Sequence, residues 1–231
     1  MTDDTETVEA GIAEAPPKRF GLLVDLEGVA FPVRETLAGA LREGLDAALV
    51  PELTPGFLCR HLVDPSSTRV AKSVAEALGL RAGVRDTLRK ALDAAITARL
   101  SEGSAAWSDG WAQLSDKATA LDFAACLVAD GAGLEIPGIE DTGILLVAGD
   151  SGKGECGGAA WSKAVRRLGV TPPACVALVG GAAACRNALL AGVGRVIAVL
   201  DAYNGGHDFS GADTMVAALA DVELAVPRGG V

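Results

Sequence analysis

The spacing of apolar residues changes near residue 122 of the chain. Before that point apolar residues recur every three or four positions, which predicts helices that each bury one face. Beyond it, short apolar runs alternate with helical stretches, which predicts strands joined by helices. The predicted helical faces include Leu37, Leu41 and Leu45, then Val70 and Val74, then Val84, Leu88, Leu92 and Ile96. The predicted strands are 124–129, 143–148, 175–180 and 195–200.

One more apolar run stands at the front of the chain, before the helical region. Residues 20–24 read FGLLV, and they lead into Asp25 and Glu27, with Gly28 next. A front strand, a helical block and then alternating strands and helices predict a parallel α/β core with a helical insertion after its first strand. Ligand sites in such sheets lie at the carboxyl ends of the strands, where a sharp turn at Gly28 would place both acids.

Composition and charge narrow the range of possible functions. Half of the 231 residues are apolar, which suffices for a sizeable core, and the formal net charge is −10. That charge argues against nucleic acid and anionic membranes as partners. No apolar run approaches the length of a spanning helix, and the acidic start of the chain is unlike a signal peptide, so we expect a cytoplasmic protein with a disordered tail over 1–18. The five cysteines lack metal-ligand spacing, so we expect no zinc site.

The sequence VDLEGVAF and the segment from residue 164 to 200 resemble motifs of the haloacid dehalogenase (HAD) superfamily. The first is similar to the D-x-D-G-[TV] motif, and the second follows the family's order of helix, L-G-V-x-P, strand, fourth motif, helix and strand. The resemblance implies a HAD-like, Rossmann-like core over 19–32 and 106–231, with a helical cap over 33–105. It covers roughly residues 20–223, although the cap region is only generally helical.

The resemblance also implies roles for individual residues. Asp25 matches the nucleophile, and Glu27 matches the acid/base position with a side chain one methylene longer. The second motif, normally Ser or Thr, falls on Ala129 or Asp130, or with another alignment on Ser151. The third motif, normally Lys, falls on Glu155, and Lys153 lies two residues away.

The fourth motif departs furthest from the family pattern. Gly180 and Gly181 stand where carboxylates would hold Mg²⁺, so we expect no bound metal, with Mg²⁺ as the cofactor only if the protein is active. Nearby, residues 204–213 contain His207, Asp208 and Asp213 in a glycine-rich stretch, which predicts a surface loop first and a segment lining the site as the alternative. Asp25→Asn is expected to leave stability unchanged or to raise it, because it removes one of two neighbouring like charges.

Two functions are consistent with these residues. The first is a catalytically impaired or non-catalytic HAD-like protein that binds a phosphorylated small molecule or a protein partner. The alternative is an active phosphate-ester hydrolase that uses Asp25 in a non-standard site. The sequence leaves the oligomeric state open, and we favour the non-catalytic function.

Overall fold

The computed structural model describes residues 20–45, 49–63, 66–102, 107–129, 144–149 and 158–225. Within these ranges, six parallel strands form one sheet in the order β3-β2-β1-β4-β5-β6. From β1 the chain first adds β2 and β3 on one side and then β4, β5 and β6 on the other, so the strand order reverses between β1 and β4. The strands are β1 (Phe20–Asp25), β2 (Phe123–Ala129), β3 (Leu145–Ala148), β4 (Cys175–Val179), β5 (Arg195–Val199) and β6 (Thr214–Val216).

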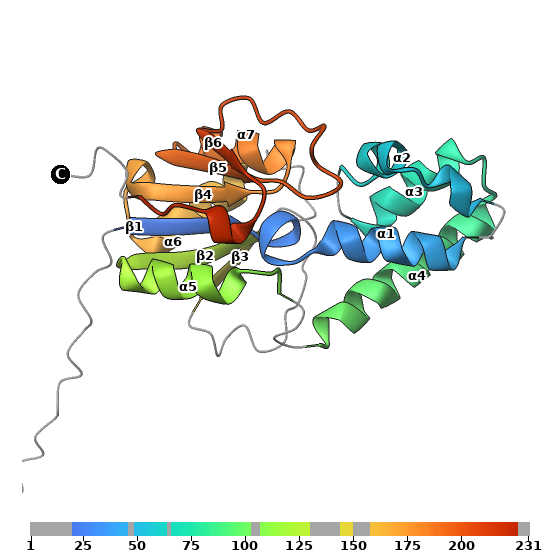
Figure 1. Ribbon diagram of the computed structural model, residues 1–231, viewed down its shortest axis with the longest axis horizontal. Coiled ribbons are helices and arrows are strands. Elements are labelled where there is room, and N and C mark those ends of the chain that lie inside the picture. The colour runs from blue at the N-terminus through green and yellow to red at the C-terminus, as the bar shows by residue number, and fades with distance from the viewer. Residues whose placement is uncertain are drawn as a thin grey trace, which may run out of the picture.

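Helices cover both faces of the sheet, which explains why its central strands are apolar throughout (Figure 1). Leu22 and Val24 of β1 point into one apolar cluster, and Leu23 points into another on the opposite face. The first face is covered by α5 (Trp111–Ala120) and the short turn η6 (Leu219–Asp221). The second face is covered by α6 (Gly158–Leu168) and α7 (Ala182–Leu190), and a short turn, η5 (Pro172–Ala174), precedes β4.

The predicted helical insertion follows β1 and lies beside the carboxyl edge of the sheet (Figure 1). Its long helices α1 and α4 pack on each other through Leu37, Leu41, Leu88 and Leu92, all buried as the pattern predicts. Val84 is an exception, because it is 45% exposed at the start of α4. The elements are α1 (Val33–Gly44), the short turn η2 (Val50–Glu52), α2 (Pro55–His61), α3 (Ser67–Ala77) and α4 (Ala82–Leu100).

The two connections between the cap and the sheet meet at one point. The N–H of Ser108 donates to the carbonyl oxygen of Ala30 at 2.9 Å. The ring of Phe31 contacts Trp107, which in turn stacks on Trp111 with ring centres 5.0 Å apart. This aromatic stack holds both connections together at the base of the cap.

Most of the predicted elements are present. The parallel core and its helical cap are confirmed, and five strands lie within two residues of their predicted positions. The sixth, β6, was not predicted. The cap limits of 33–105 remain a prediction, and the predicted tail over 1–18 lies outside the described residues. Among the described helices, none is long and apolar enough to cross a bilayer.

Candidate functional site

The candidate site lies where the strand order reverses. β1 and β4 are neighbours, with Val24 opposite Leu178, and both strands end at the same edge of the sheet. Asp25 is the last residue of β1, and Gly180 follows β4 directly. This edge faces the cap, at the position where open parallel sheets leave a crevice for ligands (Figure 1).

A single wide helical turn, η1 (Leu26–Ala30), follows Asp25. It is closed by a hydrogen bond of 2.9 Å from the N–H of Phe31 to the carbonyl oxygen of Leu26. Gly28 sits inside this turn because a Cβ there would lie 2.3 Å from Oδ2 of Asp25 and 3.0 Å from Cα of Gly180. The predicted sharp turn is therefore present, and close packing is what requires its glycine.

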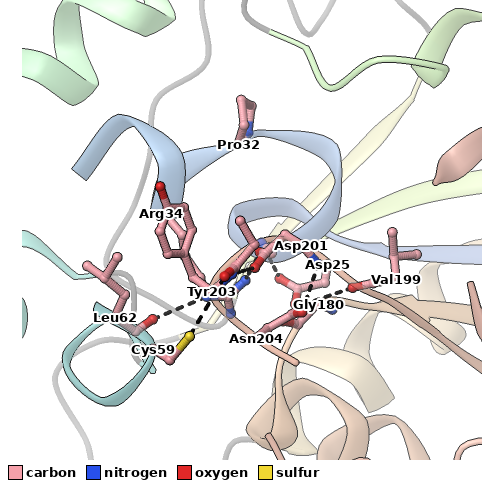
Figure 2. Close-up of polar contacts among 12 residues, drawn as sticks. Asp25, Pro32, Arg34, Cys59, Leu62, Gly180, Val199, Asp201, Tyr203 and Asn204 are labelled. Atoms are coloured by element: carbon pink, nitrogen blue, oxygen red, sulfur yellow. Dashed lines mark hydrogen bonds and ion pairs between the residues drawn. The ribbon is translucent and has the colours of Figure 1, made fainter. Parts of the chain in front are cut away.

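Backbone amides from two separate elements hold the carboxylate of Asp25. Its Oδ1 accepts a hydrogen bond from the N–H of Gly28 at 3.1 Å. Its Oδ2 accepts one from the N–H of Gly180 at 3.0 Å, and the residue is 7% exposed (Figure 2). Because each carboxylate oxygen accepts a backbone donor from a different element, the buried side chain of Asp25 is held in one orientation.

The structure locates only part of the predicted site. Glu27 is buried in the same turn as Asp25, and it also has an interaction partner. The two acids therefore share one edge of the sheet. Asp130, Ser151 and Lys153 lie outside the described residues, so their roles remain predictions.

Arg34, in the first turn of α1, brings a buried positive charge to this region and was not identified from the sequence. It is only 3% exposed. Its Nε donates to the carbonyl oxygen of Leu62 at 3.1 Å, and its Nη1 pairs with Oδ2 of Asp201 at 3.0 Å (Figure 2). Leu62 follows α2 and Asp201 follows β5, so Arg34 links the cap to the core.

The loop after β5 is tied to the end of β4 by Asn204, which is fully buried. Its Nδ2 donates to the carbonyl oxygens of Gly180 and Val199, each at 2.9 Å. Its Oδ1 accepts from the N–H of Asp201 at 2.7 Å. The stretch predicted as a surface loop, 204–213, therefore contributes buried residues to the site.

The imidazole of His207 also faces this edge. Both ring nitrogens are buried, and neither has a hydrogen-bond partner in the part of the chain that the structure describes. Burial, assisted by the positive charge of Arg34 and opposed by Asp201, lowers the pKa of His207. This environment favours the neutral form of the ring. Asp208, the acid next to it in the sequence, is exposed.

The described residues do not fit a divalent metal ion at this edge. Mg²⁺ prefers carboxylate ligands, and the family pattern has them at positions 180 and 181. There is no room for an acidic side chain at Gly180, because its Cβ would lie 2.0 Å from the carbonyl oxygen of Gly28. A Cβ at Gly181 would lie 3.0 Å from Nη2 of Arg34, which is a cation. Across the described ranges, no group of three or more His, Cys, Asp or Glu residues is arranged to hold a metal.

The fold matches solved structures of other proteins. CbbY from Rhodobacter sphaeroides, solved in complex with phosphate, has a TM-score of 0.63 and 21% identity, over 88% of this chain and 96% of that chain. A β-phosphoglucomutase from Clostridium difficile has a TM-score of 0.62 and 13% identity, over 89% and 94%. A haloacid dehalogenase-like hydrolase from Streptococcus pneumoniae has a TM-score of 0.62 and 9% identity, over 87% and 95%. No protein-family model and no curated protein sequence matches this chain.

Proposed function

We propose that this chain, which has the fold of the haloacid dehalogenase superfamily, binds a phosphorylated small molecule without hydrolysing it. One observation carries the proposal: the guanidinium of Arg34 lies beside Gly181, where the family pattern places a carboxylate that holds Mg²⁺. The positive charge at this position therefore comes from the Arg34 side chain, where the family pattern would have a bound Mg²⁺ ion.

This chain lacks the metal-binding acids that the family's chemistry requires. The family resemblance implies that Asp25 would attack phosphorus while Glu27 protonates the leaving oxygen. Both acids are negative when ionised, and a phosphate ester is an anion, so the approach needs positive charge close to Asp25. The side chains described at this edge offer no metal ligands at 180 and 181, and Arg34 is already paired with Asp201. Turnover at Asp25 is therefore poorly supported.

A phosphorylated ligand suits the fold and its neighbours. CbbY, with a similar fold, has been solved with phosphate and with xylulose-(1,5)bisphosphate. Sites of this kind sit at the carboxyl edge of the sheet, where this chain places Arg34 and His207. Fold-level analogy alone does not transfer a function, so the buried guanidinium is the specific reason to expect an anionic ligand here.

One observation favours the alternative, an active phosphate-ester hydrolase. Asp25 and Glu27 are both present at the end of β1, and Asp25 is held in a fixed orientation by two amides. A positioned carboxylate of this kind is what a nucleophile requires.

An activity assay separates the two functions. Hydrolysis of p-nitrophenyl phosphate would be measured for wild type and Asp25→Asn, with and without Mg²⁺, with circular dichroism to confirm folding. We expect no hydrolysis above background under any condition. Hydrolysis by wild type that is lost in a folded Asp25→Asn protein would establish the hydrolase instead.

Binding is tested separately by thermal melting. Inorganic phosphate, ribose 5-phosphate and fructose 1,6-bisphosphate would be added to wild type, with MgCl₂ alone as a further sample. A ligand at a hundred times its Kd stabilises the native state by about 2.7 kcal/mol, which is readily seen as a raised Tm. We expect at least one phosphorylated compound to raise the Tm and MgCl₂ alone to leave it unchanged. No shift with any phosphorylated compound would contradict the proposed function.

A further inference from the structure

Nitrogen atoms of two side chains lie against Gly181. A Cβ at this position would lie 3.0 Å from Nη2 of Arg34 and 3.9 Å from Nδ1 of His207. In the described part of the chain, these two nitrogens are the only atoms within 4 Å of that point apart from its chain neighbours. Arg34 comes from the cap and His207 from the loop after β5, so two distant segments converge on one glycine.

Arg34 has one nitrogen left for a ligand. Its Nε is used by Leu62 and its Nη1 by Asp201. Its Nη2 has no hydrogen-bond partner among the described residues, although the residue is more than nine-tenths buried. A guanidinium has five N–H donors and no acceptor, so the group facing Gly181 can bind only an acceptor atom.

His207 supplies a second incomplete hydrogen-bonding group at the same place. A neutral imidazole offers one donor and one acceptor, and buried side-chain nitrogens usually have partners. Neither ring nitrogen of His207 has a hydrogen-bond partner within the described ranges. Its Nδ1 lies 3.9 Å from the Cβ position at Gly181.

The start of α7 adds backbone donors. Gly181 is the N-cap of this nine-residue helix, and it has no side chain to cap the first turn. The first helical hydrogen bond runs from the N–H of Cys185 to the carbonyl oxygen of Gly181. The N–H groups of residues 182–184 therefore have no partner in the described structure. Such a helix start favours a bound anion.

The neighbouring acids already have partners of their own. Asp25 accepts two backbone N–H groups, and Asp201 accepts from Arg34 and from the N–H of Tyr203. Glu27 also has an interaction partner. The negative charges of Asp25 and Glu27 still disfavour a bound anion near the end of β1. The position that favours a bound anion is therefore beside Gly181.

We infer that the space beside Gly181 is an anion subsite, in which Nη2 of Arg34, His207 and the first turn of α7 bind the phosphoryl oxygens of the ligand. This inference rests on the proposed function and specifies its binding residues. Its residues are other than Asp130, Ser151 and Lys153, which the sequence predicts to bind phosphate. Among the described residues, no atom of Asp25 lies within 4 Å of the Cβ position at Gly181.

The test measures the affinity of inorganic phosphate by titration calorimetry, with sulfate in a parallel series. Gly181→Ala is the main variant, because its Cβ would occupy the converging point. The backbone of Gly181 is extended, with φ −155° and ψ 159°, so its conformation suits alanine, and only the end of the Arg34 side chain has to move. Gly206→Ala, in the neighbouring loop with nothing within 4 Å of its Cβ position, is the matched control. Arg34→Gln and His207→Phe remove the two side-chain donors.

We expect Gly181→Ala and Arg34→Gln to weaken phosphate binding at least tenfold, His207→Phe to weaken it several-fold, and Gly206→Ala to bind as wild type does. Sulfate should follow the same order, because the subsite binds a tetrahedral oxyanion. Unchanged phosphate affinity in a folded Gly181→Ala protein would overturn the subsite and leave the proposed function intact. If Arg34→Gln does not fold, Gly181→Ala alone decides the question. Wild type that binds no phosphorylated compound would instead overturn the proposed function.

Discussion

At the level of single residues, Gly180 and Gly181 are adjacent but differ in what prevents a larger side chain. A Cβ at Gly180 would meet the backbone of Gly28 at 2.0 Å, whereas a Cβ at Gly181 would meet only the end of the Arg34 side chain at 3.0 Å. Backbone cannot move aside without disturbing β1 and β4, but the end of a long side chain can. The first glycine therefore supports the fold, and the second lets the guanidinium of Arg34 approach the backbone at the site.

We predict that alanine at these two positions has unequal effects on stability. Gly180→Ala should lower the free energy of unfolding by about 4 kcal/mol or more, because two backbones would have to separate. Gly181→Ala should change it by no more than about 1 kcal/mol. Urea unfolding followed by circular dichroism measures both, with Gly206→Ala as the control. A loss at Gly180→Ala as small as that of the Gly206→Ala control would show that the contact between Gly28 and Gly180 is not rigid.

The hydrogen bonds of Asp25 give Asp25→Asn a cost that the sequence alone does not indicate. Removing a charge was expected to be neutral or stabilising, but each oxygen of Asp25 accepts a backbone N–H. An asparagine has one oxygen, so its NH₂ group would face the N–H of Gly28 or Gly180. We now predict a loss of about 1–3 kcal/mol in the free energy of unfolding, the usual effect of leaving a buried donor unpaired. Asp116→Asn on the exposed face of α5 serves as the control, and a melt of Asp25→Asn at or above the wild-type temperature would restore the earlier expectation.

At the level of elements, α1 determines how the cap meets the sheet. Arg34 in its first turn contacts both the end of α2, through Leu62, and the loop after β5, through Asp201. A second contact joins the same segments, from the Sγ of Cys59 to the carbonyl oxygen of Ala202 at 3.7 Å. The cap is thus attached to the core at two places, the two connections at its base and the end of α2.

We predict that Arg34→Gln loosens the cap. The free energy of unfolding should fall by about 2 kcal/mol, because Asp201 and the Leu62 carbonyl lose a charged donor. Hydrogen exchange should rise in residues 55–61 and stay unchanged in β4. Arg99→Gln, which removes the more exposed pair with Glu102, should have little effect on either measurement. Unchanged hydrogen exchange in residues 55–61 would mean that the Cys59 contact and the connections at the base of the cap suffice to hold α2.

The elements that could be predicted from the sequence are those whose burial leaves a pattern. β1, β2, β4 and β5 are buried on both faces and therefore appear as apolar runs. β6 is a three-residue edge strand with Thr214 and Met215 exposed, so it leaves no such run. The turn after Asp25 was predicted only as a glycine turn, because its helical form depends on packing against Gly180.

The candidate site was predictable only where its residues are close in sequence. Asp25 and Glu27 are two positions apart and follow a strand, which makes them visible. Arg34 and Asp201 are 167 positions apart, so their contact exists only in the folded chain. An arginine in a helix normally indicates an exposed face, so nothing in the sequence points to Arg34. A glycine-rich stretch normally indicates a surface loop, so the sequence names His207 only within a loop that could also line the site, and it does not single out Asn204.

At the scale of the whole molecule, both histidines make stability depend on pH. Burial lowers the pKa of His207 and of His61, with neighbouring Arg34 and Arg60 contributing in the same direction and Asp201 opposing at His207. Below pH about 6.5 the unfolded chain therefore binds more protons than the native state. Stability should rise with pH through this range and level off above about pH 7.

We predict that wild type is less stable at pH 5.5 than at pH 7.5 and that His207→Phe reduces this difference. Phenylalanine keeps a ring beside Phe209 but cannot be protonated. Urea unfolding at the two pH values gives the comparison. A His207→Phe protein with the full wild-type difference would assign the pH dependence to other groups.

The strand order has a consequence for how the chain is made. β1 is the first strand to leave the ribosome, yet its partners are Phe123–Ala129 on one side and Cys175–Val179 on the other. Contacts so far apart in sequence form slowly, and until residue 179 emerges one edge of this apolar strand stays open. Until then the nascent chain is exposed to aggregation. We expect a fragment ending at residue 170 to sediment as aggregate on release from translation, while the full-length chain remains in the supernatant.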